Sequence, residues 1–94
     1  IGIDMEEIKE HKINLIKKVC NEIEIAEIEK SKNKIEKFLE IWTKKESTVK
    51  LLDKSIFYDT KNILNTKENI KYKAFKKNNN IITLAKLCQK NWKT

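Results

Sequence analysis

The chain contains no proline and only one glycine, Gly2, among its 94 residues. Proline and glycine are the residues that most often interrupt a helix, so their near absence lets helices run without breaks. The lysine- and glutamate-rich composition also favours helices with a charged surface. We therefore expect an all-α fold, a compact bundle of four or five helices that forms one domain over residues 1–94.

The last segment, residues 80–94, shows the clearest helical periodicity. Its apolar residues recur at helical spacing, and Asn80 is a suitable N-cap. A helix this short is not stable alone in water, so its apolar face must be buried by the rest of the chain. The residues of this face are Ile81, Leu84, Ala85, Cys88 and Trp92.

The N-terminal half predicts two further helices. Residues 4–29 are typical of a helix that begins at Asp4, with a break or bend between residues 21 and 30. Ser31 is a candidate N-cap of the second helix, whose inward stripe consists of Ile35, Phe38, Leu39 and Trp42.

The middle of the chain predicts shorter elements. Ser47 or Thr48 is expected to cap a third helix, and residues 55–64 to form another helical stretch. Residues 65–80 are consistent with either a helical extension or a loop, which ends in a turn at residues 78–80 because asparagine tolerates left-handed geometry. The expected core consists of Leu39, Trp42, Val49, Leu52, Ile56, Leu84, Ala85, Cys88 and Trp92.

The positive charge is concentrated in the second half of the chain. Residues 1–47 hold ten lysines and eleven acidic residues, a net charge of −1, whereas residues 48–94 hold eleven lysines and three acidic residues, a net charge of +8. Such a surface could bind nucleic acid or an acidic protein segment, or could be a solvated lysine surface. All basic residues are lysines, and the lack of arginine disfavours bidentate recognition of phosphate or guanine.

The residues that carry catalysis are sparse. The one histidine, His11, cannot complete a zinc site or a Cys/His nucleophile pair, and no glycine-rich phosphate loop exists. Cys20 and Cys88 are expected to be reduced and packed. The acidic residues Glu22, Glu24, Glu27 and Glu29 are expected to form a solvated helix face. We therefore predict no catalytic residue, no cofactor and no metal, and a protein that is not an enzyme.

Two binding functions remain open from the residues alone. Nucleic acid could bind along residues 61–77, with Tyr58, Tyr72 and Phe75 available for stacking. Alternatively, a helical bundle could dock a short peptide in a groove, with lysines attracting its acidic residues. No apolar run approaches the length of a membrane span, and the start at Ile1 suggests a domain excised from a longer protein.

Two segments resemble the N-terminal domain of transcription elongation factor TFIIS. The segment Ser47-Thr48-Val49-Lys50-Leu51-Leu52 is similar to that domain's Thr-aliphatic-x-Leu-Leu segment. Residues 84–93 are similar to its closing Leu-Ala-Lys-x-x-x-Lys-x-Trp-Lys helix, with Leu84 and Trp92 as the signature. The chain departs from the family at Ile56-Phe57, where Ile-Gly is usual, and in a longer connection at residues 65–78.

The resemblance implies a nuclear, non-catalytic docking module of a transcription elongation factor. Its partners would be transcription-machinery proteins with short acidic and apolar motifs, among them complexes associated with RNA polymerase II. The same domain in an elongin A-like or other chromatin factor is the alternative within the family. We expect a monomer whose structural signature is Leu52, Leu84 and Trp92 and whose partner contacts are Lys50, Lys54, Phe57, Tyr58, Lys61, Lys86 and Lys90.

Overall fold

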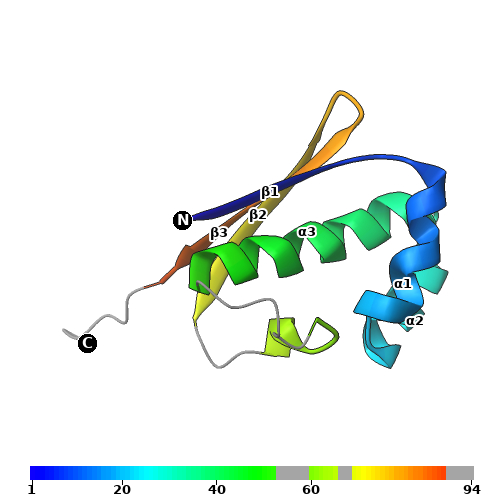
Figure 1. Cartoon of the computed structure of the whole chain (residues 1–94). Helices are drawn as coiled ribbons and strands as arrows, with labels where there is room; N and C mark the ends of the chain where they lie inside the picture. Colours follow the sequence, from blue (N-terminus) through cyan, green and yellow to red (C-terminus); the bar gives the residue numbers. More distant parts are fainter. Residues whose placement is uncertain (53–59, 66–68, 89–94) are drawn as a thin grey trace.

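The computed structural model describes residues 1–52, 60–65 and 69–88, and shows a three-stranded antiparallel sheet with helices packed on one face (Figure 1). The fold is therefore α+β, and the expected all-α bundle is wrong. The strands are β1 (Gly2–Glu7), β2 (Ile70–Lys77) and β3 (Asn80–Leu87). The helices are η1 (Glu10–Leu15), α1 (Ile16–Val19), α2 (Glu22–Lys30), α3 (Lys34–Leu52) and η2 (Ile63–Asn65). Among the described helices, none combines the length and apolar character needed to cross a membrane.

The sheet has the strand order β1-β3-β2, so the first strand pairs with the last. On β3, Thr83 is the register partner of Asp4 on β1 and of Ala74 on β2. A tight turn joins β2 to β3, and Asn78 adopts a φ of 57° there. The expected turn is confirmed at Asn78 and Asn79, whereas Asn80 already belongs to β3. Residues 70–77 form β2, so neither the helical extension nor the loop expected there is correct.

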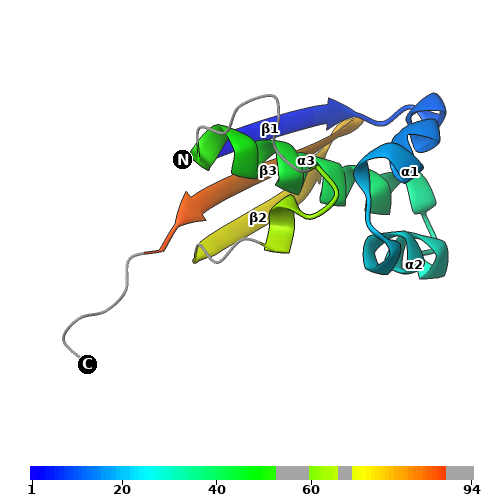
Figure 2. The same ribbon diagram turned by 60° about the horizontal axis from the view of Figure 1, so that its bottom comes forward.

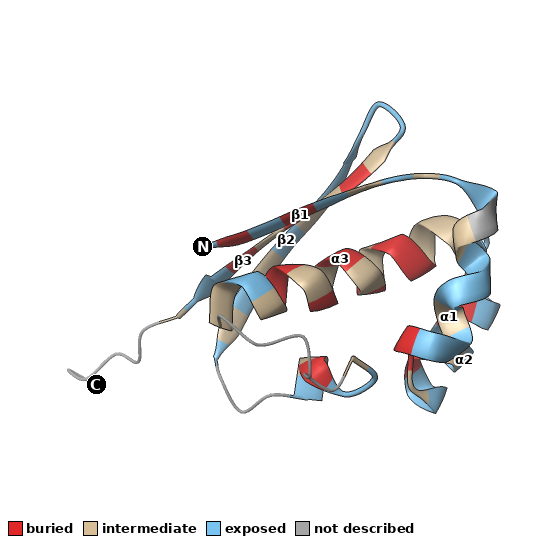
Figure 3. Ribbon diagram, viewed as in Figure 1, coloured by how far each residue is buried: buried red, intermediate tan, exposed pale blue. Residues whose placement is uncertain are grey.

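Helix α3 lies across one face of the sheet and forms the centre of the core (Figures 1 and 3). The predicted stripe is confirmed in its main part, because Phe38 and Leu39 are fully buried. Ile35 and Trp42 pack at the edge of the core and are half-buried. This helix fits its prediction because it is amphipathic at the helical period and contacts the sheet on one side.

The start and end of α3 differ from the prediction. The helix begins at Lys34, and the side chain of Asn33, rather than Ser31, accepts the Glu36 backbone N–H at 3.1 Å. Ser47 and Thr48 lie inside α3, where their hydroxyls donate to the Lys44 carbonyl at 3.0 and 2.7 Å. A hydroxyl bonded to the preceding turn does not cap a new helix, so no third helix begins at these residues.

The N-terminal segment does not form one long helix. Residues 2–7 are a strand, and the helical segment breaks at Cys20 and Asn21, at the start of the expected 21–30 interval. Asn21 caps α2 in a capping box: its side chain accepts the Glu24 N–H, and Glu24 accepts the Asn21 N–H. The Asn21 side chain also donates to the Lys61 carbonyl at 3.1 Å, which ties α2 to the segment before η2.

The C-terminal segment, predicted as a helix, is strand β3. Ile81, Thr83 and Ala85 are buried against α3, whereas Leu84 is half-buried on the opposite face of the sheet. The consecutive β-branched residues 81–83 favour a strand, and pairing with two neighbouring strands overrides the helical spacing. Of the remaining expected core residues, Val49, Leu52 and Cys88 are half-buried, while Ile56 and Trp92 lie outside the described residues.

A buried lysine, Lys45, fills the side of α3 that faces away from the sheet. Its side chain is fully buried, and its ammonium lies 2.7 Å from a carboxylate oxygen of Glu24 on α2. The same ammonium donates to the carbonyls of Val19 (2.7 Å), Thr60 (2.6 Å) and Lys61 (2.9 Å). This one group therefore links α3 to α1, α2 and the segment before η2. Figure 2 shows α1 and α2 beside each other, near the end of α3 where that helix begins.

Candidate functional site

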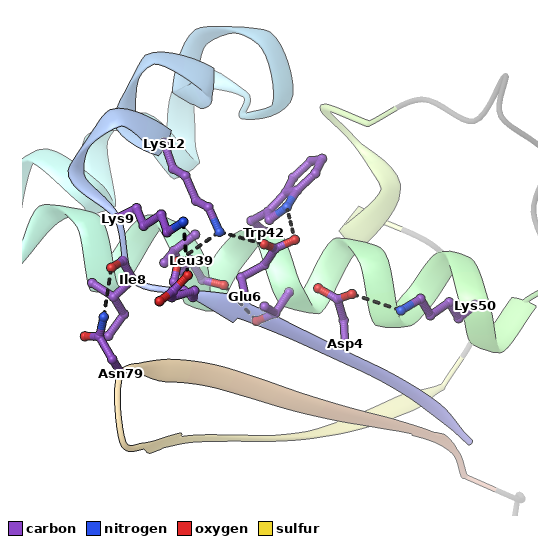
Figure 4. A network of polar contacts seen from close by, with 11 residues as sticks. Asp4, Glu6, Ile8, Lys9, Lys12, Leu39, Trp42, Lys50 and Asn79 are labelled. Atoms are coloured by element: carbon purple, nitrogen blue, oxygen red, sulfur yellow. Dashed lines mark hydrogen bonds and ion pairs between the residues drawn. The ribbon is translucent and has the colours of Figure 1, made fainter.

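The inner face of β1 is polar, which is unusual for a strand that packs on a helix. Alternation along the strand places Gly2, Asp4 and Glu6 towards α3, and leaves Ile3 and Met5 exposed on the other face (Figure 4). The buried side of a strand normally carries apolar residues. Acidic residues in this position therefore indicate a functional site between β1 and α3.

Gly2 allows the close approach of β1 to α3. A Cβ atom at this position would lie 2.1 Å from the Ser47 carbonyl oxygen and 2.9 Å from the Leu51 backbone nitrogen. Both atoms belong to the helix backbone and cannot move aside as a flexible side chain would. The absence of a side chain at Gly2 therefore sets how near Asp4 comes to the helix.

We expect Gly2→Ala to separate the start of β1 from α3. Overpacking of this kind typically costs about 1–3 kcal/mol, and the clash here is with backbone, so the free energy of unfolding in urea should fall by at least that amount. Glu7→Ala, on the exposed side of the same strand, is the matched control and should leave the unfolding midpoint almost unchanged. Equal midpoints for the two variants would contradict the close approach.

Asp4 carries a buried carboxylate with one satisfied oxygen. Its Oδ1 accepts a hydrogen bond from the Lys50 ammonium at 2.9 Å, while its Oδ2 is buried and has no hydrogen-bond partner among the described residues. Burial raises the pKa of Asp4 above its usual value, and Lys50 opposes this effect. A buried acceptor without a donor is costly, and a bound cation would relieve that cost.

Glu6 is held in place by two donors. Its Oε1 accepts the indole N–H of Trp42 at 3.2 Å, and its Oε2 accepts the Lys12 ammonium at 2.8 Å (Figure 4). Lys12 also donates to the Glu7 carbonyl at 2.8 Å, and the Trp42 ring stacks on Phe38 with centroids 6.5 Å apart. Trp42 is therefore more than a core residue, because its indole fixes the second carboxylate of β1.

Glu46 is the third carboxylate on this side of the molecule. Trp42, Glu46 and Lys50 occupy successive turns of α3, and the outer two contact Glu6 and Asp4 respectively. The helical repeat therefore places Glu46 between these two contacts, beside β1. Within the described ranges, no three His, Cys, Asp or Glu side chains come close enough to form a metal cage. The pair between Asp4 and Lys50, and the position of Glu46 one helical turn before Lys50, define a candidate site of two carboxylates with Lys50 at its edge.

Of the predicted contact residues, the structure brings one into this site. Lys50 pairs with Asp4, whereas Lys86 is exposed on the far face of β3. Lys61 is exposed, and its carbonyl is bound by Lys45 and Asn21. Lys54, Phe57, Tyr58 and Lys90 lie outside the described residues.

Sequence reasoning missed both carboxylates of the site. Asp4 was predicted to be the start of a helix, and Glu46 was not predicted to be a site residue. Two signals could have identified them: the alternation of Gly2, Asp4 and Glu6 with apolar residues, and the four-residue spacing of Glu46 from Trp42 and Lys50.

The family model of the 4′-phosphopantetheinyl transferase superfamily matches residues 1–90. No curated protein and no solved structure matches the sequence significantly. The resemblance to the TFIIS N-terminal domain is therefore wrong: it rested on short lysine and leucine patterns, and its closing helix is strand β3 here. The nuclear location and the polymerase-associated partners rested on that resemblance and lose their support with it. The prediction of a non-catalytic protein is also wrong, because this chain belongs to the 4′-phosphopantetheinyl transferase superfamily, a family of enzymes.

Proposed function

We propose that the chain transfers a 4′-phosphopantetheinyl group from coenzyme A to a hydroxyl group of an acceptor protein. Two observations support this proposal: the family match and the geometry of the site between β1 and α3. The observation that carries the site assignment is the buried, unpartnered Oδ2 of Asp4 on the same side of the molecule as Glu46 and Lys50.

The reaction replaces a phosphoanhydride linkage of the diphosphate by a phosphate ester linkage to the acceptor. The acceptor oxygen forms a bond to the phosphorus that carries pantetheine as the hydroxyl loses its proton. The bond from that phosphorus to the bridging oxygen of the diphosphate breaks, and adenosine 3′,5′-bisphosphate leaves. Catalysis of such a transfer depends mainly on positioning and on stabilising the negative charge of the phosphate oxygens.

The two carboxylates fit a magnesium ion bound together with the diphosphate. Magnesium is commonly held in enzymes by one or two carboxylates, several waters and substrate phosphates rather than by a cage of protein ligands. Asp4 and Glu46 would hold the ion, and the buried Oδ2 of Asp4 provides an oxygen that no described donor satisfies. When bound, the ion would neutralise charge on the diphosphate.

Lys50 supplies the positive charge on the protein side. Its side chain is 54% exposed, and its ammonium reaches Asp4 at 2.9 Å and the Ile3 carbonyl at 3.0 Å. A lysine that is this exposed, at the edge of a carboxylate site, can turn towards a phosphate. We therefore assign Lys50 to binding the phosphate that is transferred.

The acceptor is expected to be acidic. The chain has a net charge of +7, and an acidic protein would approach such a surface faster through long-range attraction. A carrier protein with a reactive serine and a negatively charged surface has this chemistry.

The test is a transfer assay with purified chain, coenzyme A, magnesium chloride and an apo acyl carrier protein. Mass spectrometry should show a carrier heavier by one phosphopantetheinyl group, and EDTA should abolish the product until excess magnesium is added. A carrier that stays unmodified, while a known transferase modifies the same preparation, would count against the proposal. Product formation unaffected by EDTA would contradict the cation site.

A further inference from the structure

The half of α3 that carries the candidate site is buried through hydroxyl groups rather than through apolar side chains. The buried residues in the first half of the helix are Phe38, Leu39 and Ile41. The second half instead buries three small hydroxyl residues completely, namely Thr43, Ser47 and Thr48. Apolar packing is non-directional, whereas a hydrogen bond weakens steeply when it is misaligned. Hydroxyl contacts are therefore suited to fixing this half of the helix at one position on the sheet.

Thr83 on β3 holds α3 at Thr43. The two hydroxyl oxygens lie 2.7 Å apart, and both side chains are fully buried. Thr43 donates its single hydroxyl proton to the Leu39 carbonyl at 2.7 Å, so Thr83 is the donor between the two threonines. Thr83 is also the register partner of Asp4 on β1. This contact therefore ties α3 to the point on β3 that pairs with Asp4.

Tyr72 on β2 holds α3 at a second point. Its hydroxyl oxygen lies 2.7 Å from that of Thr48. Thr48 donates its own proton to the Lys44 carbonyl at 2.7 Å, so the phenol of Tyr72 is the donor. The Lys44 ammonium lies 5.8 Å from the centroid of the Tyr72 ring, which adds a cation–π contact one helical turn away. One side chain of β2 therefore contacts two successive turns of α3.

The two hydroxyl contacts lie on either side of Glu46 along the helix. Thr43 and Thr48 are five residues apart, about 7.5 Å along the helix axis, and they meet different strands. Two separate points of this kind limit both the sliding and the rotation of the helix on the sheet. Glu46 lies between them and Lys50 follows within the next turn, so the same contacts set where both side chains stand relative to β1.

We propose that Tyr72 and Thr83 are positioning residues for the transfer reaction. Their hydroxyls hold the second half of α3 so that Glu46 and Lys50 stay aligned with Asp4 across the candidate site. This inference rests on the proposed function. Groups of a functional site must be held to within about 0.5 Å by the residues around them. A displacement of about 1 Å, caused far from the reacting atoms, can lower a rate by about 100-fold.

Two variants remove these contacts and keep the packing. Thr43→Val/Thr83→Val replaces both hydroxyl partners by apolar groups of the same shape, which is nearly neutral for stability. Tyr72→Phe removes the phenol hydroxyl, and Thr48 keeps its bond to the Lys44 carbonyl. Each variant should lower kcat by about tenfold, and the two together by about 100-fold. The apparent affinity for magnesium should fall with kcat, while the urea midpoint of unfolding stays close to that of the wild type.

Two further variants control for the loss of a hydroxyl as such. Thr83→Ser retains the donor and should retain most of the wild-type kcat. Ser31→Ala removes a hydroxyl that donates to the Asn33 carbonyl before the start of α3, away from the candidate site, and should leave kcat unchanged. If kcat stayed at the wild-type value in Tyr72→Phe and in Thr43→Val/Thr83→Val, the proposal would be overturned. It would also be overturned if kcat fell only in proportion to the fraction of folded protein.

Residual dipolar couplings of the backbone N–H bonds test the same proposal without turnover. They report the orientation of α3 relative to the sheet in the free chain. In the variants that lack the contacts, the couplings of residues 43–50 should depart from the wild-type orientation, whereas those of Ser31→Ala should not. Unchanged couplings would overturn the positioning role even in an active enzyme. A wild-type chain that transfers nothing, in which the variants still shift these couplings, would instead contradict the proposed function.

Discussion

Replacement of Lys45 by methionine is expected to lower the free energy of unfolding by about 3–5 kcal/mol, the usual cost of breaking a buried ion pair by removing one partner. The Lys45 side chain is fully buried, and its ammonium is the donor to the Glu24 carboxylate and to three backbone carbonyls. Methionine fills a similar volume but donates nothing. Since small domains are stable by only about 5–15 kcal/mol, this loss should be evident in urea unfolding.

A double variant separates the charge from the packing. Lys45→Met/Glu24→Gln removes the unpaired carboxylate, so it should regain part of the stability lost in Lys45→Met alone. Lys18→Met, which replaces an exposed lysine on α1, should change stability by no more than about 0.5 kcal/mol. If Lys45→Met unfolded at the same urea concentration as Lys18→Met, the ammonium would not hold these elements together.

Asp4→Asn and Glu46→Gln are expected to reduce the rate of transfer by about 100- to 1000-fold, the usual effect of removing one group that stabilises charge in the transition state. Both changes keep the shape of the side chain and remove the negative charge that would hold a cation. Magnesium affinity, measured by isothermal titration with coenzyme A present, should fall in both variants. Glu7→Gln, on the exposed side of β1, should retain wild-type activity.

Asp4→Asn should lower the rate of transfer without lowering the free energy of unfolding. Burial raises the pKa of Asp4 in the folded state, so the contribution of this group to stability is fully present below its unfolded pKa. That contribution is lost as the pH rises through the higher folded pKa, and ionised Asp4 therefore disfavours folding at neutral pH. Asparagine removes this cost and gives up only the pair with the largely exposed Lys50. We expect a variant with strongly reduced activity whose unfolding free energy at pH 7 is no lower than that of the wild type.

The first part of helix α3 could be predicted from the sequence because the apolar residues that it packs on the sheet follow one helical period. The strands could not, and β3 shows why. Its apolar residues occupy both faces of the sheet. Ile81 and Ala85 face the helix, and Ile82 and Leu84 lie on the outer face. The same sequence therefore also fits the apolar stripe of a helix. Short apolar runs are ambiguous in this way, and pairing with distant strands decides between the two structures.

The candidate site could not be predicted from the sequence for a different reason. The inward positions of β1 are held by glycine and acidic residues, and the outward positions by Ile3 and Met5, so the strand reverses the usual pattern of a buried face. The sequence pattern predicts a helix cap at Asp4, because an aspartate before an apolar run commonly has that role. The requirement for a charged site overrides the preference for an apolar interior, and only the three-dimensional arrangement reveals it.

The strand order β1-β3-β2 also has a consequence for biosynthesis. Residues 2–7 leave the ribosome long before their pairing partner, residues 80–87, has been made. Until then Asp4 has no strand to hold it against α3, and the edge of the nascent segment is open to other chains. The candidate site therefore forms only after β3 has been made, and chaperones that shield the early segment should raise the yield of folded protein.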